Sequence, residues 1–303
     1  MAEPLVSVVI ACPNRSWMLE ECLRAIDAQT YRKYETIVLD DAKTGKVRPA
    51  EKRNLGIREA KGEIIAFIDD DAYPDVRWLE KAIANFTDES VGAVGGPAVT
   101  PPNDGWRERI GGLVYENPLV SGNYRYRYRA TGLKRDIDDY PSCNLLVRKS
   151  VLDAIGGYRT DFWPGEDTLL CRDIVAAGYR IVYDPECVVY HHRRAVFGPH
   201  LRQLARYAFH RGYFAKRFPA NSLRLSYFVP TFFVLGLPFM PWIWPLYALY
   251  AFLVAVTSFN CNPLVWALTA AGVVVSHVVY GFKFALGICA DKAPCEYIGK
   301  DHP

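Results

Sequence analysis

The sequence lacks three features that would narrow its function at once. Its eight cysteines include no CxxC pair and no metal-site spacing, which argues against a zinc site or a disulfide framework and favours reduced thiols. It also lacks a strong net charge. The formal value of +3 is too small to indicate nucleic-acid binding. No signal peptide follows Met1, so we expect the soluble part of the protein to stay in the cytosol.

Acidic residues are missing from a stretch in the second half of the chain. Between His191 and Arg217 there are seven Arg or Lys residues, four of the six histidines, and no Asp or Glu. Such a segment is attracted to the surface of a membrane that contains anionic lipid. The sequence therefore predicts a basic amphipathic, interfacial segment over residues 199–222.

Charged side chains of either sign are missing farther along. Residues 225–259 and 263–282 contain none, and a helix of about 20 apolar residues spans a bilayer. We therefore expect a transmembrane region over 223–290 with about three spans and a polar tail over 291–303. In the first of these uncharged stretches three prolines would mark a turn between two short spans; they are Pro238, Pro241 and Pro245. The alternative is a buried helical core.

The first 198 residues alternate between apolar runs and segments with helical spacing. This alternation is typical of an α/β domain with a doubly wound, mostly parallel, Rossmann-like sheet. The expected strands are 5–10, 36–39, 64–69, 91–94 and 187–190, and the expected helices lie near 19–26, 50–60, 76–86 and 168–177.

Polar residues follow three of these strands, and in such sheets ligands bind beyond the carboxyl ends of the strands. They are Pro13 and Asn14, Asp40 and Asp41, and the triplet Asp69-Asp70-Asp71. Three adjacent carboxylates repel one another, so a cation is expected to neutralise them. Carboxylate oxygens suit Mg²⁺ or Mn²⁺, and these ions also hold substrate phosphates. The alternative for the triplet is a solvated turn that caps a helix.

Tyrosine and arginine alternate strictly over residues 124–129. As a strand, this segment would carry tyrosines on one face and arginines on the other. We expect an edge strand with a solvated basic face, or else a contact with an anionic acceptor or a lipid headgroup.

Several motifs, in order along residues 4–217, resemble those of membrane-anchored glycosyltransferases of family 2, which have the GT-A fold. Asp69-Asp70-Asp71 resembles the DxD metal motif, and Gly165-Glu166-Asp167 resembles the motif that supplies the catalytic base. Gln203 to Tyr207 resembles the QxxRW motif of polysaccharide synthases, with Tyr in place of Trp. The other matching segments are Val6 to Arg15, where Ala11-Cys12 departs from the usual pattern, Asp40-Asp41, and Arg53 to Ile57 with Ala60 to Gly62.

The resemblance implies a role for each matching residue. Asp167 would be the general base, and Glu166 would position the acceptor. Asp69, Asp71 and His191 would bind Mn²⁺ or Mg²⁺. The residues implied in binding the nucleotide and donor are Pro13, Asn14, Arg15, Asp40, Asp41, Arg53, Asp69, Asp70, Gln203, Arg206 and Tyr207.

Two of these roles have structural alternatives. The charges of Glu166 and Asp167 could serve only to stabilise the first turn of a helix. His191 and His192 could form a structural pair.

The resemblance also implies an activity. It is the metal-dependent, inverting transfer of a sugar from a nucleotide-diphosphate donor to a membrane-associated acceptor, either a polyprenyl-linked glycan or a growing polysaccharide. The protein would be a multi-pass cell-membrane protein with a cytosolic catalytic domain, and it could form homo-oligomers. One alternative is an inactive membrane scaffold that binds nucleotide-sugar. A nucleotidyltransferase is disfavoured, because no Gly-rich triphosphate loop follows the first strand.

Overall fold

The computed structural model describes residues 3–292, which form two compact units. The described part of the first unit consists of residues 3–99 and 129–191, and that of the second consists of residues 100–128 and 192–292. The expected polar tail over 291–303 lies almost wholly outside the described residues.

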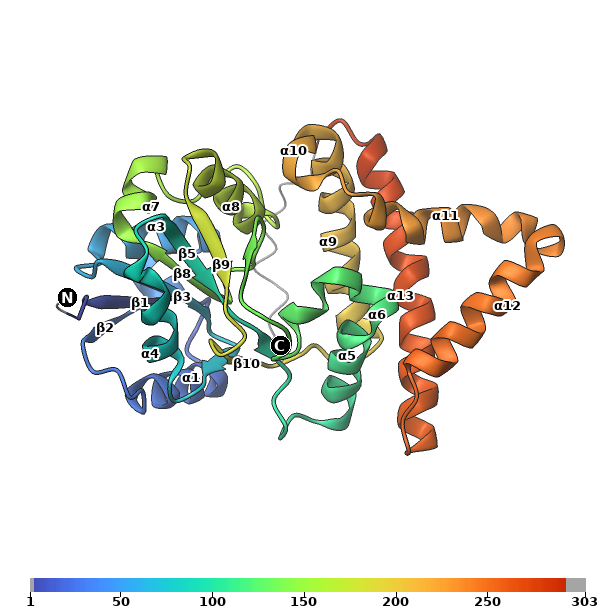
Figure 1. Ribbon diagram of the computed structural model, residues 1–303, viewed down its shortest axis with the longest axis horizontal. Helices are drawn as coiled ribbons and strands as arrows, with labels where there is room; N and C mark the ends of the chain where they lie inside the picture. Colours follow the sequence, from blue (N-terminus) through green and yellow to red (C-terminus); the bar gives the residue numbers. More distant parts are fainter. Residues whose placement is uncertain (1–2, 293–303) are drawn as a thin grey trace. The chain divides into compact units, whose positions relative to one another are not determined.

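A seven-stranded mixed sheet forms the centre of the first unit (Figure 1), in the order β2-β1-β3-β8-β5-β9-β7. Five of the seven strands run in one direction, and only β8 and β7 run against them. The expected α/β class and the mostly parallel sheet are therefore confirmed. The strands are β1 (Val6–Ala11), β2 (Tyr34–Leu39), β3 (Ile64–Asp69), β5 (Val91–Gly95), β7 (Arg135–Ile137), β8 (Asn144–Arg148) and β9 (Arg180–Tyr183).

Helices cover both faces of this sheet. In Figure 1, α3 and α7 lie on one side of it, and α1 and α4 lie on the other. The apolar residues of α1 recur at helical spacing, so Leu19, Cys22 and Ile26 are buried together against the sheet. The α-helices of this unit are α1 (Trp17–Asp27), α2 (Asp41–Thr44), α3 (Pro49–Glu59), α4 (Trp78–Ile83), α7 (Lys149–Ile155) and α8 (Glu166–Ala176), and a 3-10 turn, η1 (Ala84–Thr87), follows α4.

The parallel register of the first three strands aligns their carboxyl ends. Ala11, the last residue of β1, pairs with Leu39 on one side and with Asp69 on the other. The segments that follow these strands therefore leave the sheet at the same edge. This is the arrangement that the sequence predicts for the acidic residues.

A second, three-stranded sheet lies beyond this edge, in the order β4-β10-β6. Its strands are β4 (Ala72–Pro74), β6 (Ala98–Val99) and β10 (Val189–His191). The buried amide of Asn144 ties this sheet to the first, since its Nδ2 donates to the carbonyls of Gly96 and Cys187, both at 2.7 Å. Its Oδ1 accepts a 2.8 Å bond from the indole of Trp78.

The second unit is helical. Its α-helices are α5 (Trp106–Glu116), α6 (Pro118–Ser121), α9 (Gly198–Arg217), α10 (Pro219–Ser222), α11 (Val229–Gly236), α12 (Met240–Thr257) and α13 (Pro263–Cys289), with 3-10 turns η2 (Gly122–Arg127), η3 (Leu225–Phe228) and η4 (Leu237–Phe239). Glycines let α9 and α13 pack closely, because a Cβ added at Gly212 would lie 2.1 Å from the carbonyl oxygen of Phe284.

Two segments of the described residues are long and apolar enough to cross a membrane, where the sequence suggests about three. They are Leu225–Thr257, of 33 residues, and Pro263–Cys289, of 27. The difference arises because α11 has only eight residues, about 12 Å of helix, and is too short to span a bilayer by itself. Many apolar side chains of the first segment are exposed, among them Phe232 at 65% and Trp242 at 76%.

The expected edge strand over residues 124–129 is wrong. Residues Gly122–Arg127 form the 3-10 turn η2 instead, after Gly122 reverses the chain with a φ of +49°. The guanidinium of Arg127 lies 4.7 Å from the ring centre of Tyr124. A 3-10 turn aligns residues three apart, and a flat strand does not.

Candidate active site

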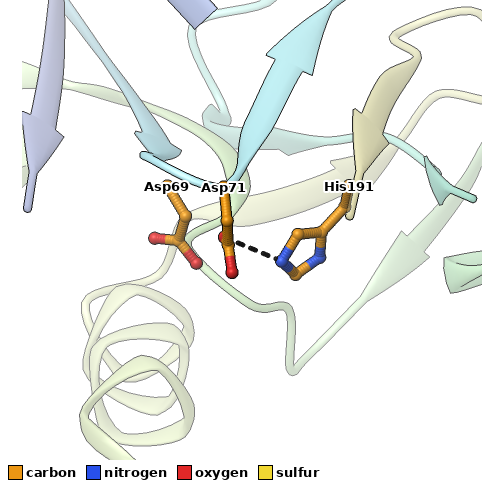
Figure 2. A group of neighbouring side chains, drawn as sticks. All are labelled: Asp69, Asp71 and His191. Atoms are coloured by element: carbon orange, nitrogen blue, oxygen red, sulfur yellow. Dashed lines mark hydrogen bonds and ion pairs between the residues drawn. The ribbon is translucent and has the colours of Figure 1, made fainter. Parts of the chain in front are cut away.

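Asp69, Asp71 and His191 converge at the edge of the first unit (Figure 2). Each offers one ligand atom, and these atoms all lie within 4.8 Å of one another. Nε2 of His191 is 3.0 Å from Oδ1 of Asp71. Two carboxylates and an imidazole suit Mn²⁺ well and Mg²⁺ less well, and three protein ligands leave positions for substrate oxygens and water. The residues therefore fit the expected divalent ion.

The two sheets bring these three side chains together. Asp69 ends β3, and Asp71 immediately precedes β4, so the chain passes from one sheet to the other within the acidic triplet. The antiparallel pairing of β4 with β10 sets Ala72 opposite His191, which places the histidine beside Asp71. Only His191 of the histidine pair joins the cluster, since Nδ1 of His192 bonds to Asp104.

The middle residue of the triplet is not part of the ligand cluster. Asp70 and Asp71 form a turn between β3 and β4, and only Asp71 of the two lies with Asp69 and His191. Asp70 is buried, with 9% of its surface exposed. Burial and the charge of Asp70 together raise the pKa of the Cys12 thiol to about 12. Cys12 therefore stays a neutral thiol at neutral pH.

Arg53 connects the acidic cluster with the acidic pair of α8. From α3, one terminal nitrogen of its guanidinium lies 2.8 Å from Asp69, and the other lies 3.1 Å from Glu166. The second nitrogen is also 3.7 Å from Oδ1 of Asp167. Burial alone would lower the pKa of Arg53, but these carboxylates raise it above its ordinary value, so the bridging charge is permanent.

Glu166 and Asp167 form the first turn of α8, after Gly165 with its φ of +119°. The Glu166 side chain is 7% exposed, whereas that of Asp167 is 27% exposed. Burial, and then the charge of Asp167, raise the pKa of Glu166 to about 7, against the lowering effect of Arg53. Burial also raises the pKa of Asp167, against Arg53 and a hydrogen bond from Ser142. Asp167 is thus the more accessible carboxylate, and its basicity is increased.

Two further residues, which no motif singles out, hold this pair. The hydroxyl of Ser142 donates to Oδ1 of Asp167, and it lies 2.6 Å from the hydroxyl of Tyr158. The ring of Tyr158 lies 5.5 Å from the guanidinium of Arg53. The backbone of Tyr158 is fixed in turn by Asn54, whose amide group makes two 2.8 Å bonds to it.

The residues expected to bind the nucleotide follow β1 and β2, and the structure gives several of them internal partners. Asp40 caps α2 by accepting a 2.9 Å bond from the backbone of Lys43. Asp41 forms an ion pair with the buried Lys52, a residue that sequence reasoning missed because it belongs to no recognised motif. The carbonyl of Pro13 accepts a 3.0 Å bond from the backbone of Asp41, which ties the two loops together. Asn14 is in the same loop, and Arg15 is exposed and 3.5 Å from Glu20.

Gln203, Arg206 and Tyr207 belong to the second unit, on α9. Their spacing of three and four residues puts them on one face of this helix. Tyr207 is half exposed.

A family model described as glycosyl transferase family group 2 matches residues 64–274, more than half of the chain. The chain belongs to this family. It is therefore a glycosyltransferase, and the enzyme class expected from the motifs is confirmed.

Among curated relatives of this glycosyltransferase, the glycosyltransferase AglE of Haloferax volcanii is 27% identical over 226 residues, which cover 66% of this chain and 70% of the relative. The pre-mycofactocin glycosyltransferase of Mycobacterium tuberculosis is 31% identical over 179 residues. That match covers 54% of this chain but only 33% of the mycobacterial protein.

Among solved structures, the mannosyltransferase PcManGT of Pyrobaculum calidifontis, in complex with GDP-Man and Mn²⁺, superposes with a TM-score of 0.59 and 21% identity. The superposition covers 96% of this chain and 88% of the other. Together with the family match, it confirms the GT-A fold.

Proposed function

We propose that this glycosyltransferase moves a sugar from a nucleotide-diphosphate donor to a membrane-associated acceptor, with inversion at the anomeric carbon and with the help of a divalent metal ion. The acceptor would be a polyprenyl-linked glycan or a growing polysaccharide. The observation that carries the proposal is the convergence of the Asp69, Asp71 and His191 cluster with the acidic pair Glu166 and Asp167 through one guanidinium, that of Arg53.

In this proposal Asp167 is the general base. The acceptor hydroxyl gives its proton to the Asp167 carboxylate while its oxygen bonds to the anomeric carbon from the face opposite the leaving phosphate. The bond to that phosphate breaks in the same step, so the configuration inverts. Asp167 suits this role because it is the more exposed member of the pair and because burial raises its pKa.

The metal ligands belong to the leaving-group side. A divalent ion held by Asp69, Asp71 and His191 would stabilise negative charge on the departing diphosphate. Asp71 and His191 already lie 3.0 Å apart, and Arg53 holds the carboxylate of Asp69 in place at 2.8 Å. In the second unit, Gln203, Arg206 and Tyr207 would contribute to donor binding from one helix face.

Arg53 takes a different part from the one that the sequence suggests. Both terminal nitrogens of its guanidinium are engaged by protein carboxylates, so we assign it a positioning role between the metal ligands and the base rather than a direct contact with the donor. Asp40 and Asp41 keep their proposed place near the nucleotide, with Lys52 neutralising Asp41.

The protein would work at the cell membrane, with its two apolar helical segments inserted and its first unit in the cytosol. Arg211, Lys216, Arg217 and Arg224 precede the first segment and favour this orientation, because positive residues tend to remain on the cytosolic side. A homo-oligomer remains part of the proposal.

The test is a donor screen with the full-length protein in detergent, measuring the nucleotide diphosphate that is released with and without Mn²⁺. GDP-mannose is the first donor to try, since PcManGT was solved with it. Asp71→Ala should abolish metal-dependent turnover. Asp167→Asn should lower turnover by ~10²–10⁴-fold and leave donor affinity, measured by calorimetry, nearly unchanged.

The outcomes separate the alternatives. Near-normal turnover in Asp167→Asn would leave Glu166 as the next candidate base. Activity of Asp71→Ala that no longer responds to a chelator would place the metal elsewhere. Tight nucleotide-sugar binding without release of nucleotide diphosphate from any donor, with or without acceptor lipids, would favour the inactive scaffold.

A further inference from the structure

Three arginines from three segments of the second unit gather around two tyrosines. The guanidinium of Arg127 lies 4.7 Å from the ring centre of Tyr124, and that of Arg224 lies 6.0 Å from it. The guanidinium of Arg211 lies 5.1 Å from the ring centre of Tyr227. The two rings are 5.9 Å apart, so the five side chains form one group, which we call the arginine–tyrosine cluster.

The cluster lies at the start of the apolar part of the chain. Arg224 immediately precedes Leu225, the first residue of one candidate membrane segment, and Tyr227 lies within η3. The ring of Tyr227 is 6.5 Å from that of Phe284, near the end of the other candidate segment, α13. If both segments cross the membrane, the cluster therefore lies at the level where they meet the headgroups on one side.

The charge of the cluster is concentrated. No Asp or Glu occurs in residues 117–135 or 187–290, the two stretches of sequence that supply all five side chains. Three guanidinium groups near one another concentrate positive charge, which attracts an anion. Stacking on a tyrosine uses the face of a guanidinium, whereas its N–H donors lie in the plane and suit a phosphate.

The tyrosines strengthen the match to an anion. Burial, and then the charge and hydrogen bond of the neighbouring Tyr227, raise the pKa of Tyr124, so its phenol stays neutral and adds no negative charge beside the arginines. All five side chains are partly buried, which limits their motion and reduces the entropy lost when a ligand binds.

We propose that the arginine–tyrosine cluster binds the phosphate group of a lipid at the membrane surface. The inference rests on the proposed membrane-side function, and the five residues of the cluster are not among those assigned to the donor, the metal ion or the base. Two sources share this chemistry: the phosphate of an isoprenyl-phosphate acceptor and the phosphodiester of an anionic phospholipid.

The test measures lipid binding to the full-length protein in neutral detergent by native mass spectrometry. The probes are a short isoprenyl monophosphate, phosphatidylglycerol, uncharged diacylglycerol and inorganic phosphate as competitor. Wild-type protein should bind the first two and not diacylglycerol. Arg211→Gln combined with Arg224→Gln should weaken that binding by at least ~10-fold, as expected when charge-assisted hydrogen bonds are lost.

Two variants keep the result interpretable. Arg217→Gln removes one charge from an exposed position at the end of α9, close to the cluster in sequence, and should change binding by less than ~2-fold. Arg127→Lys keeps the charge and loses the planar fork, and it should weaken binding of the monophosphate more than that of phosphatidylglycerol if the acceptor is the source. Thermal unfolding and gel filtration would confirm that each variant is folded.

Preferential binding of the isoprenyl monophosphate would identify an acceptor site, and equal binding of phosphatidylglycerol would identify a site for bulk lipid. Full displacement by millimolar inorganic phosphate would overturn the lipid assignment. So would equal lipid binding by the double variant and the wild type. The lipid-binding assay does not depend on sugar transfer. If the protein binds lipid here but transfers no sugar in the donor screen, only the proposed function is contradicted.

Discussion

The role of Arg53 can be tested with a single substitution. Loss of a positioning residue lowers kcat, whereas loss of a donor-binding residue raises the donor Kd. Arg53→Lys keeps the charge but cannot span Asp69 and Glu166 at once. We expect kcat to fall by ~10²-fold, the cost of misplaced catalytic groups, and donor Kd to change by less than ~3-fold. Arg58→Lys, an exposed position on the same helix, serves as control and should behave as wild type.

Kinetics and calorimetry together decide the question. A loss of donor affinity of tenfold or more with kcat unchanged would return Arg53 to the donor-binding role that its motif implies.

The raised pKa of Glu166 predicts that the stability of the folded protein depends on pH. Its folded-state pKa is raised to about 7, above the ordinary value for glutamate, so the folded protein holds a proton that the unfolded chain has released. The stability from this group is present at low pH and is lost as the pH rises from about 4.5 to about 7, with a slope of at most about 1.4 kcal/mol per pH unit.

Glu166→Gln, which cannot release a proton, should remove this loss. We expect the melting temperature of metal-free wild-type protein to fall more steeply between pH 5 and 7 than that of the variant. Parallel curves for the two proteins would show that the carboxyl group is not protonated in the folded state.

Two glycines show how closely two helices of the second unit pack. A Cβ at Gly212 on α9 would lie 2.1 Å from the carbonyl oxygen of Phe284, and one at Gly287 on α13 would lie 2.0 Å from that of Phe209. Backbone atoms cannot yield as a flexible side chain does. Gly212→Ala should therefore destabilise the protein by ~1–3 kcal/mol, although alanine is the better helix former.

The measurement is thermal or denaturant unfolding in detergent. Arg202→Ala, an exposed change on the same helix, is the control and should stay within ~0.5 kcal/mol of wild type. A stabilised Gly212→Ala would mean that α9 and α13 are not packed this closely.

Elements also show how far the sequence can predict this structure. Buried apolar runs such as Ile64 to Ile68 identify their strands, and the parallel register then brings the acidic loops to one edge. The strand expected over 187–190 anticipates β10, but the position of His191 also depends on its partner β4, a strand of three residues that carries no periodic signal.

The contact of Ser142 with Asp167 in the acidic pair could not be predicted from the sequence either. Ser142 lies before β8, which runs antiparallel between β3 and β5, and nothing local in its sequence sets that order. The alternation of Tyr124 to Arg129 is misleading, because the segment forms a 3-10 turn in which Tyr124 and Arg127, three residues apart, lie on one side.

The two apolar segments predict how the whole molecule is arranged in the membrane. Two spans would form a hairpin, with Cys261 between them on the outside and Cys289 at the end of the second span on the cytosolic side. These two cysteines are exposed, whereas the other five described ones are buried, so they are natural probes. In a Cys295→Ser background, an impermeant maleimide added to intact cells should label Cys261 and spare Cys289.

Inverted vesicles should give the reverse, and Cys261→Ser and Cys289→Ser would assign the signals. Three spans would place Cys289 outside and Cys261 inside, which is the opposite pattern. Release of the full-length protein by alkaline carbonate would show that neither segment is inserted.

The boundary between the two units falls immediately after a proposed metal ligand. His191 is the last residue of this stretch of the first unit, and His192 is the first residue of the next stretch of the second. A truncated enzyme ending at this boundary would therefore carry a new terminal carboxylate on His191 itself. That extra negative charge would attract divalent cations to a site already built from two aspartates and a histidine. Metal affinities measured on such a fragment would include the contribution of the new terminal carboxylate as well as that of the native ligands.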